Sequence, residues 1–324
     1  MARARNIAKV LVIARGPLGR FVQALAAMRR IREAHHGARI TLLTTQPFAA
    51  LARACPYVDQ VDADGDPEDF GDWMALIRPL RAARFDRVYD LEGSAWTQRV
   101  FQLLGPFPPA WSGTAFGCAL PCRNPARADM HPLERQADQL KAAGIWPDAP
   151  TDPGSAPPPD ASWITGRMLQ PRVQPRPHVL LAPGPASDPP QARWPARAYG
   201  DLALQLRAQG YEVIIVGGPE DSALAHTIQH RSPARDLTGR TDFAQIAALA
   251  ARAALAIGAD SGLTHLAAAA GAPTLALSPK ANDPRRTGPR GYVAVLQADS
   301  LEELSVDEVM RAARRLMPPI QMTM

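Results

Sequence analysis

The chain has few cysteines, few lysines and no long apolar run, and each scarcity excludes a class of protein. The three cysteines, Cys55, Cys118 and Cys122, lack the second pair that a zinc site needs, so we expect reduced thiols. No apolar stretch has the roughly 20 residues that span a bilayer. The first apolar run, residues 10–14, is too short for the core of a signal peptide, so we expect a cytoplasmic protein.

Positive charge is abundant although lysine is not. Lysine occurs at positions 9, 141 and 280, so arginines carry nearly all of the positive charge, and the net charge is +5. Arginine forks suit phosphates and carboxylates. The charges form no block of one sign, which argues against nucleic acid as a partner and favours anionic ligands.

The order of apolar runs and turns predicts two domains of the same kind. An apolar strand at residues 10–14, a glycine turn and a helix open the chain, and the same pattern returns from residue 179, roughly 170 residues later. Residues 148–160 contain five prolines and are typical of a linker. We therefore predict an α/β protein with two Rossmann-like domains, residues 1–160 and 161–324, facing an interdomain cleft.

Two further segments of the predicted domains have recognisable patterns. Residues 105–125 are rich in proline, glycine and aromatic side chains, so they can be regular only briefly. Ser305 and Glu308 have the spacing of a capping box, which predicts a last helix through Leu316.

The stretch from Ala253 to Arg290 predicts a strand, a polar turn, a helix and a second strand. The turn, residues 258–262, precedes a helix in which apolar residues recur at helical spacing, and Gly271 is placed to end it. Free backbone N–H groups at such a helix start suit a phosphate. Asp260, Ser261 and His265 would surround that point.

A structural interpretation of this stretch also exists. Strand, turn and helix units are common in α/β proteins, and one glycine turn is weak evidence of a ligand. His265 could cap the helix or pack. The combination of Asp, Ser, Thr and His at one helix start, followed by a loop rich in proline and arginine at residues 278–290, favours a site.

These residues resemble glycosyltransferase family 9, the heptosyltransferases that build the inner core of lipopolysaccharide. Residues 260–269 read D-S-G-L-T-H-L-A-A-A, and residues 283–289 continue with a proline- and glycine-containing loop, similar to the family signature. The resemblance implies a GT-B fold and inverting transfer of a sugar from a nucleotide-sugar donor such as ADP-heptose, without metal or other cofactor. It also implies a lipid-linked or glycan acceptor, and a peripheral contact with the inner face of the inner membrane. In GT-B proteins the last helix often crosses back to the first domain.

The resemblance assigns roles to individual residues. For the donor they are Gly184, Glu220, Asp260, Ser261, Gly262, Leu263 and His265. Glu220 would meet ribose hydroxyls, although an acid at a helix start is also stabilised by the helix dipole. Further contacts with the diphosphate or the acceptor are expected from Arg20, Arg193, Lys280 and Arg285.

The sequence departs from the family pattern at the two positions closest to the chemistry. Arg20 stands where relatives have the aspartate proposed as the base, and arginine cannot accept a proton. Ala192 stands where relatives have a lysine directed at the donor phosphates, and Glu92 replaces a glutamine in a strand ending D-L-Q-G-S.

Two interpretations follow from these departures. Either another residue is the base and Arg20 binds an acidic acceptor, or the chain binds a nucleotide sugar without transferring it. A sugar-nucleotide epimerase or hydrolase is a third class, which would turn over its substrate without an acceptor.

Overall fold

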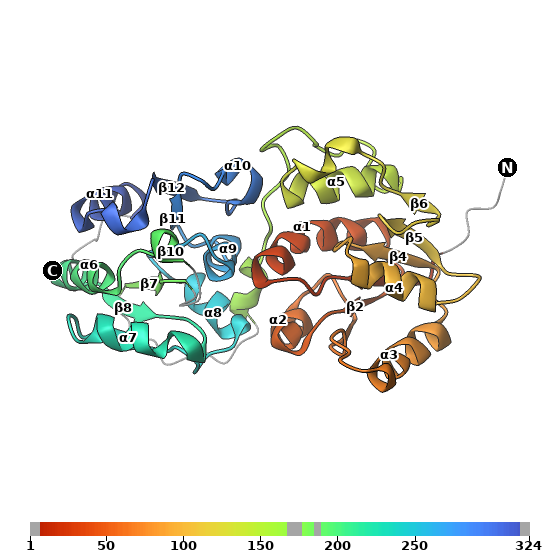
Figure 1. Cartoon of the computed structure of the whole chain (residues 1–324), viewed down its shortest axis with the longest axis horizontal. Coiled ribbons are helices and arrows are strands. Elements are labelled where there is room, and N and C mark those ends of the chain that lie inside the picture. The colour runs from red at the N-terminus through yellow and green to blue at the C-terminus, as the bar shows by residue number, and fades with distance from the viewer. Residues whose placement is uncertain (1–6, 167–176, 185–188, 318–324) are drawn as a thin grey trace. The chain divides into compact units, whose positions relative to one another are not determined.

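A computed structural model describes residues 7–166, 177–184 and 189–317 (Figure 1). The chain divides into two compact units, Met1–Pro158 and Pro159–Met324, here called the first and the second unit. The division falls inside the proline-rich segment. This segment is held at two points: Gly154 donates its backbone N–H to Glu134 Oε1 at 2.9 Å, and Ala161 donates to the Ala269 carbonyl at 2.7 Å.

The first unit is a six-stranded sheet in the order β3-β2-β1-β4-β5-β6. All five strand pairs are parallel. The strands are β1 Lys9–Ile13, β2 Arg39–Leu43, β3 Gln60–Asp62, β4 Arg87–Asp90, β5 Ala110–Gly113 and β6 Leu120–Pro121. The helices are α1 Leu18–Ala34, α2 Ala49–Ala54, α3 Phe70–Ala83, α4 Ala95–Leu103 and α5 Pro132–Ala142. Residues 105–125 contain β5 and β6, of four and two residues, so this stretch is regular only briefly, as predicted.

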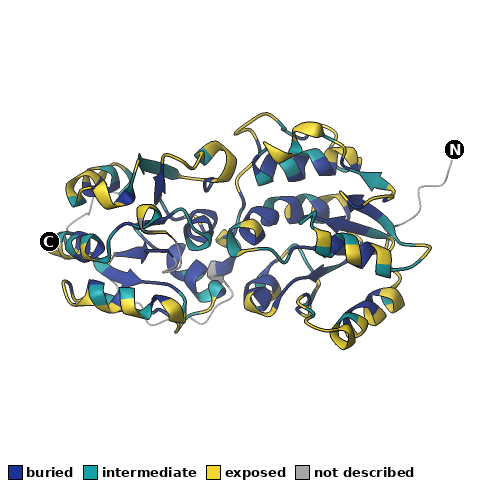
Figure 2. Ribbon diagram, viewed as in Figure 1, coloured by how far each residue is buried: buried dark blue, intermediate teal, exposed yellow. Residues whose placement is uncertain are grey.

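Helices cover both faces of this sheet, which explains the unbroken apolar run in β1. Leu11 and Ile13 pack into a cluster with side chains of α3 and α4. Val10 and Val12, which point to the opposite face, are also fully buried. Figure 2 shows the strands as a buried layer between helices with exposed outer sides. A strand buried on both faces needs apolar residues at successive positions, as this sequence has.

The second unit repeats the same topology. Its six parallel strands have the order β12-β11-β10-β7-β8-β9, which read from the other edge is the order of the first unit. The strands are β7 His178–Ala182, β8 Glu212–Ile215, β9 Arg235–Asp236, β10 Leu255–Ala259, β11 Thr274–Pro279 and β12 Val293–Ala298. The helices are α6 Ala196–Ala208, α7 Ser222–Gln229, α8 Phe243–Ala250, α9 Gly262–Ala269, α10 Pro284–Thr287 and α11 Val306–Leu316. The predicted α/β class and the predicted internal repeat are confirmed.

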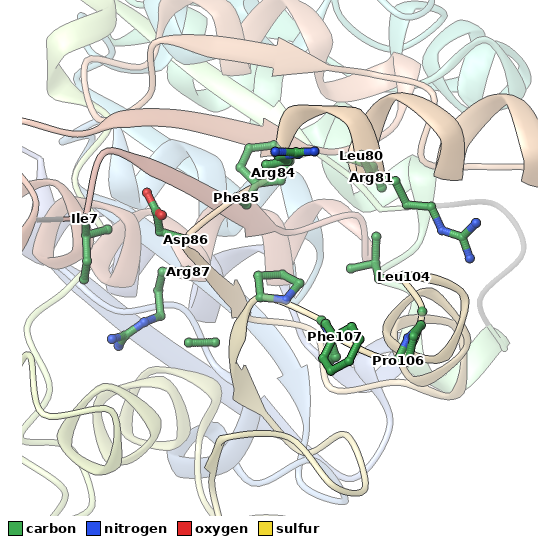
Figure 3. A pocket seen from close by; sticks show the side chains of 14 residues that line it. Ile7, Leu80, Arg81, Arg84, Phe85, Asp86, Arg87, Leu104, Pro106 and Phe107 are labelled. Atoms are coloured by element: carbon green, nitrogen blue, oxygen red, sulfur yellow. The ribbon is translucent and has the colours of Figure 1, made fainter. Parts of the chain in front are cut away.

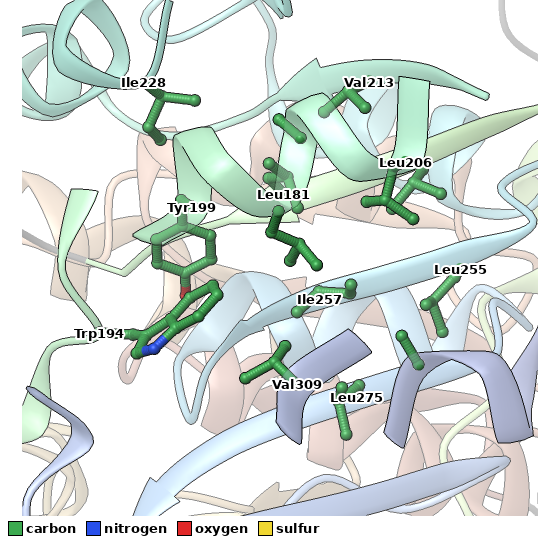
Figure 4. Packing of buried hydrophobic residues seen from close by; sticks show 14 of the residues in the cluster. Leu181, Trp194, Tyr199, Leu206, Val213, Ile228, Leu255, Ile257, Leu275 and Val309 are labelled. Atoms are coloured by element: carbon green, nitrogen blue, oxygen red, sulfur yellow. The ribbon is translucent and has the colours of Figure 1, made fainter. Parts of the chain in front are cut away.

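The core of the second unit joins strands to α6 and α11 (Figure 4). Trp194 and Tyr199 meet edge to face, with ring centroids 4.6 Å apart. The Trp194 indole N–H donates to the Leu304 carbonyl at 2.9 Å, so the buried ring has its polar atom satisfied. Burying such large side chains contributes several kcal/mol to the stability of this unit.

The last helix, α11, begins with the predicted capping box. Ser305 Oγ accepts from the Glu308 N–H at 3.3 Å, and Glu308 Oε2 accepts from the Ser305 N–H at 3.0 Å. Val309, Met310 and Ala313 of α11 belong to the core of the second unit. The described helix, residues 306–316, therefore covers its own sheet, and the crossing back to the first domain stays a prediction.

Each sheet has one point where the strand order reverses. In the first unit it lies between β1 and β4, and in the second between β7 and β10. Ligands of open α/β sheets bind beyond the carboxyl ends of the strands at such switch points. The residues that follow these four strands are therefore the first candidates for a functional site.

Candidate functional site

The second switch point is formed where β10 ends and α9 begins. Asp260 follows the strand and Ser261 is the N-cap residue, with the extended backbone typical of that position. An N-cap serine ordinarily accepts a hydrogen bond from the helix, but the Ser261 side chain makes no cap hydrogen bond. Its Oγ is buried and has no partner among the described residues. The helix start therefore keeps free N–H groups and a free hydroxyl together.

Gly258 in β10 makes this arrangement possible. A Cβ atom at this position would lie 2.8 Å from Thr264 Oγ1 in α9 and would collide with the Ala182 carbonyl of β7. Thr264 Oγ1 in turn donates to the Ala259 carbonyl at 2.5 Å. The close approach of two strands and the helix start thus depends on the glycine.

Asp260 and His265 form a pair behind the helix start. His265 Nε2 lies 3.6 Å from Asp260 Oδ1, and both side chains are only 8% exposed. Ser278 Oγ lies 3.5 Å from Asp260 Oδ2, so the carboxylate is held between α9 and β11. When protonated, His265 offsets the charge of Asp260, which otherwise repels a phosphate at this place.

The structure brings these predicted donor residues together at one strand edge. Gly262 and Leu263 form the first turn of α9, and both are partly exposed. Gly184 is the second residue after β7 and has φ +90°, a left-handed conformation that favours glycine. Since β7 and β10 pair from Leu255 to Gly258, their carboxyl ends are neighbours.

Glu220 lies one strand further along the same edge. It is exposed in a short 3₁₀ turn, Pro219–Asp221, that follows β8. Its carboxylate lies over the backbone of Gly218, where a Cβ would clash with it. The neighbouring Asp221 accepts from the Gly218 N–H at 2.9 Å and holds the turn. The stabilising acid is thus Asp221, and Glu220 is available to a ligand.

The basic residues predicted to contact the diphosphate or the acceptor do not all lie at the second switch point. Lys280 pairs with Asp299 at 2.9 Å, so it is directed towards β12, away from the switch point; both groups are exposed. Arg285 is exposed in α10, where the Asp283 side chain caps its N–H. Arg193 follows the short 3₁₀ turn Pro190–Ala192. Residues 185–188, between Gly184 and this turn, lie outside the described residues.

The first switch point is built differently. Arg15 follows β1 and its guanidinium contacts four groups: the Gly65 carbonyl at 2.6 Å, Asp66 at 2.8 Å, Glu92 at 3.4 Å and the Trp96 ring, whose centroid is 4.2 Å away. Sequence reasoning did not assign a role to Arg15 or Glu92. The signal that could have found them is their place, because both come two residues after neighbouring strand ends.

Arg20 lies in the first turn of α1, where it is exposed. It belongs to a group of arginines with Arg135 in α5 and Arg127. Burial, together with the charges of Arg127 and Arg20, lowers the pKa of Arg135. A cluster of like charges at a strand edge favours an anion in its midst.

Asp90, the last residue of β4, is fully buried beside this group. It accepts from the N–H groups of Gly93 at 2.8 Å and Glu92 at 3.1 Å, and so shapes the turn that carries Glu92. Burial raises the pKa of Asp90 to about 6, against the opposing effect of these hydrogen bonds.

A hollow of about 1020 Å³ in the first unit lies at the other edge of the sheet (Figure 3). Among its lining residues, Arg84 precedes β4, Arg87 is the first residue of β4, and Phe107 precedes β5. Because these are the amino ends of the strands, the hollow is separate from the switch point of the first unit.

None of the described helices combines the length and the apolar character needed to cross a membrane. Two parallel sheets of equal strand order, each covered by helices, make this an α/β chain with two Rossmann-like units, the kind of unit from which GT-B proteins are built. Comparison with known proteins assigns it to a family of that class.

A sequence model of glycosyltransferase family 9 (heptosyltransferase) matches residues 73–303. Lipopolysaccharide heptosyltransferase 2 of Escherichia coli strain K12 is 26% identical over 293 residues, which cover 83% of this chain and 82% of the relative. The solved structure of E. coli ADP-heptose LPS heptosyltransferase II has a TM-score of 0.78 at 24% identity, covering 95% of this chain and 98% of that one. An E. coli heptosyltransferase solved with ADP has a TM-score of 0.74 at 18% identity, covering 95% and 99%.

The chain belongs to glycosyltransferase family 9, and it is a glycosyltransferase of the heptosyltransferase kind.

Proposed function

We propose that this protein transfers a heptose from an ADP-heptose donor to the glycan core of a lipopolysaccharide or a related acceptor, with inversion and without a metal. The observation that carries the proposal is the N-cap at Ser261, whose hydroxyl is buried at the start of α9 and has no partner in the part of the chain that the structure describes. The names of the relatives support the choice of sugar and of nucleotide.

The donor diphosphate fits the start of α9. The N–H groups in the first turn of a helix have no partner within the helix, and the helix dipole adds partial positive charge. Gly262 and Leu263 supply N–H groups there, and Ser261 supplies its hydroxyl. His265, beside Asp260, adds a cation when protonated. These groups stabilise the charge that develops on ADP as the sugar departs.

The acceptor fits the first switch point. Arg20 and its neighbours Arg127 and Arg135 suit a phosphate or a sugar-acid carboxylate on the acceptor. An acceptor anchored in a lipid would place the reaction in the cytoplasm, at the inner face of the inner membrane. This assignment of acceptor and place rests on the arginine cluster and on the names of the relatives.

A second candidate function is a nucleotide-sugar-binding protein that does not transfer. Arg20 and Ala192 favour it, because neither can perform the role that the family resemblance gives to its position. Both candidates share the donor site, so the first experiment tests that site alone.

Calorimetric titration with ADP measures the donor site. His265→Ala should weaken ADP binding at least about tenfold, which is about 1.4 kcal/mol, because it leaves the Asp260 charge without its neighbour. Asp260→Ala should weaken it as well, because Asp260 holds the His265 ring beside the helix start. Asp299→Ala, an aspartate whose partner Lys280 is directed away from the site, is the matched control and should leave the affinity unchanged. Unchanged affinity in both site variants contradicts the proposed donor site.

Turnover then separates the candidates. Release of the nucleoside diphosphate, ADP from ADP-sugars and UDP from UDP-sugars, is measured with and without a heptose-deficient lipopolysaccharide as acceptor. A transferase releases ADP much faster with the acceptor than without it, and a protein that only binds the nucleotide sugar releases none. An epimerase or hydrolase consumes its substrate in the absence of the acceptor.

A further inference from the structure

An inverting transfer needs a group that takes the proton of the acceptor hydroxyl, and Arg20 cannot be that group. Three carboxylates lie at the first switch point: Asp66, Asp90 and Glu92. Their surroundings differ enough to choose among them.

Asp90 has a structural task. It is fully buried, and it accepts the N–H groups that hold the turn after β4. Asp66 is loosely placed, since its side chain is 77% exposed. A catalytic base must be held in position and must also offer an oxygen to the substrate. Asp90 Oδ2 is buried and has no hydrogen-bond partner among the described residues, but Asp90 is 0% exposed and so is less accessible to a substrate than a partly exposed carboxylate. Asp66 lacks a fixed position.

Glu92 has both properties. Its side chain is 10% exposed, and Oε1 is held by Arg15 at 3.4 Å. Oε2 is buried and has no hydrogen-bond partner among the described residues. A buried carboxylate oxygen without a donor is costly, and such an atom in a folded protein points to a missing partner. A ligand hydroxyl is the kind of donor that would satisfy it.

Arg15 fixes the position of Glu92. The guanidinium is itself held by the Gly65 carbonyl, by Asp66 and by the Trp96 ring, so it cannot follow the carboxylate if that moves. A planar guanidinium held at several points orients its partner carboxylate more strictly than a single contact does.

We propose that Glu92 is the general base of this chain and that Arg15 positions it. The inference rests on the proposed transferase function. The acceptor hydroxyl gives its proton to the Glu92 carboxylate while its oxygen attacks the anomeric carbon of the donor. The bond from that carbon to the β-phosphate oxygen breaks, ADP leaves with the electron pair, and the proton passes from Glu92 to water. Because Oε2 is buried in the free chain, the side chains that cover it must move aside when the acceptor binds.

The test compares Glu92→Gln with the wild type and with Glu33→Gln, an exposed helix glutamate that pairs with Arg29 and serves as matched control. ADP-heptose and heptose-deficient lipopolysaccharide are the substrates. Glu92→Gln should lower kcat by about 100-fold or more, the size of a general-base effect, with the KM for ADP-heptose unchanged. Glu33→Gln should keep the wild-type rate.

A second variant separates catalysis from folding. Glu92→Ala should be as slow as Glu92→Gln, and added formate should restore part of its rate, because a small carboxylate can occupy the space left by the side chain. Thermal unfolding of all variants gives their folded fraction.

The outcomes are distinct. If Glu92→Gln keeps a kcat within about threefold of the wild-type value, Glu92 is not the general base, and the proposed transferase function is unaffected. A slow, folded Glu92→Ala without formate rescue also counts against Glu92 as the base. A wild type that binds ADP but consumes no ADP-heptose overturns the transferase, and the base with it.

Discussion

The two switch points occupy equivalent positions in two sheets of the same topology, but different side chains surround the carboxylate at each of them. Ile13 pairs with Asp90 in the first unit, and Ala182 pairs with Gly258 in the second. Two residues beyond these pairs lie Arg15 and Glu92 in one unit, and Gly184 and Asp260 in the other. Each carboxylate has a basic side chain beside it, Arg15 at 3.4 Å or His265 at 3.6 Å.

The difference lies in what fills the space beside the carboxylate. In the first unit the long Arg15 side chain reaches the carboxylate and locks it in place. In the second unit Gly184 brings no side chain, and the N-cap of α9 stays unfilled. A locked carboxylate suits proton transfer, and an open helix start suits a diphosphate. The two switch points thus share one backbone topology but form two different candidate sites.

The largest expected effect concerns the strand end itself, where the first unit has Asp90 and the second has Gly258. Gly258→Val should destabilise the second unit by about 3 kcal/mol or more, because its side chain would meet the Ala182 carbonyl and Thr264. Chemical denaturation measures this. Ala254→Val, at a partly exposed position just before β10, should cost much less. Equal losses would show that the approach of β7 and α9 is not tight.

A smaller effect is expected at Arg20, which the account assigns to the acceptor. Arg20→Asp should lower transfer roughly 10- to 100-fold through a higher KM for the acceptor, because a charge-assisted contact becomes a repulsion. Steady-state kinetics measures the change, and the affinity for ADP should not move. Faster transfer in Arg20→Asp would mean that the new carboxylate restores a lost base.

The smallest effect is a pH dependence peculiar to the first unit. Burial raises the pKa of Asp90 to about 6, above the value near 3.9 of an unfolded chain. Its contribution to stability is therefore fully present below about pH 4 and is lost as the pH rises through about 6. Asp90→Asn cannot ionise, so the decline in unfolding free energy from pH 4 to 6.5 should be smaller by about 1 to 3 kcal/mol.

Denaturation curves at several pH values measure this slope. Asp148→Asn changes an exposed aspartate in the same way and should keep the wild-type pH dependence. The same slope in Asp90→Asn and in the wild type would contradict the raised pKa.

The sequence predicted the architecture well because the switch between strand and helix periodicity is local. The order of strand, polar turn and helix could be predicted from successive residues alone, and Gly271 follows that helix with φ +96°. The bounds were less exact, because β10 is Leu255–Ala259 and includes the first two residues of the predicted turn 258–262. The capping box at Ser305 is equally local. The repeat of the opening pattern then implied two sheets of one topology.

Contacts between distant residues could not be predicted in this way. The four contacts of Arg15 come from one loop (Gly65 and Asp66), from the turn after β4 (Glu92) and from helix α4 (Trp96), and the pairing of Lys280 with Asp299 depends on the register of β11 and β12. Nothing in the residue types near Ser261 shows that its hydroxyl lacks a helix partner. Side-chain partners of this kind depend on the order of the strands in the sheet, which cannot be read from the sequence alone.

The central claim is that the start of α9 holds the diphosphate of the donor. Backbone amide NMR of the isotope-labelled chain, titrated with ADP and separately with adenosine, tests it most directly. The account predicts that ADP shifts the amide signals of Ser261, Gly262 and Leu263 strongly, and that adenosine, which lacks phosphates, leaves them nearly unchanged. If ADP binds and these three signals stay in place, the claim is contradicted.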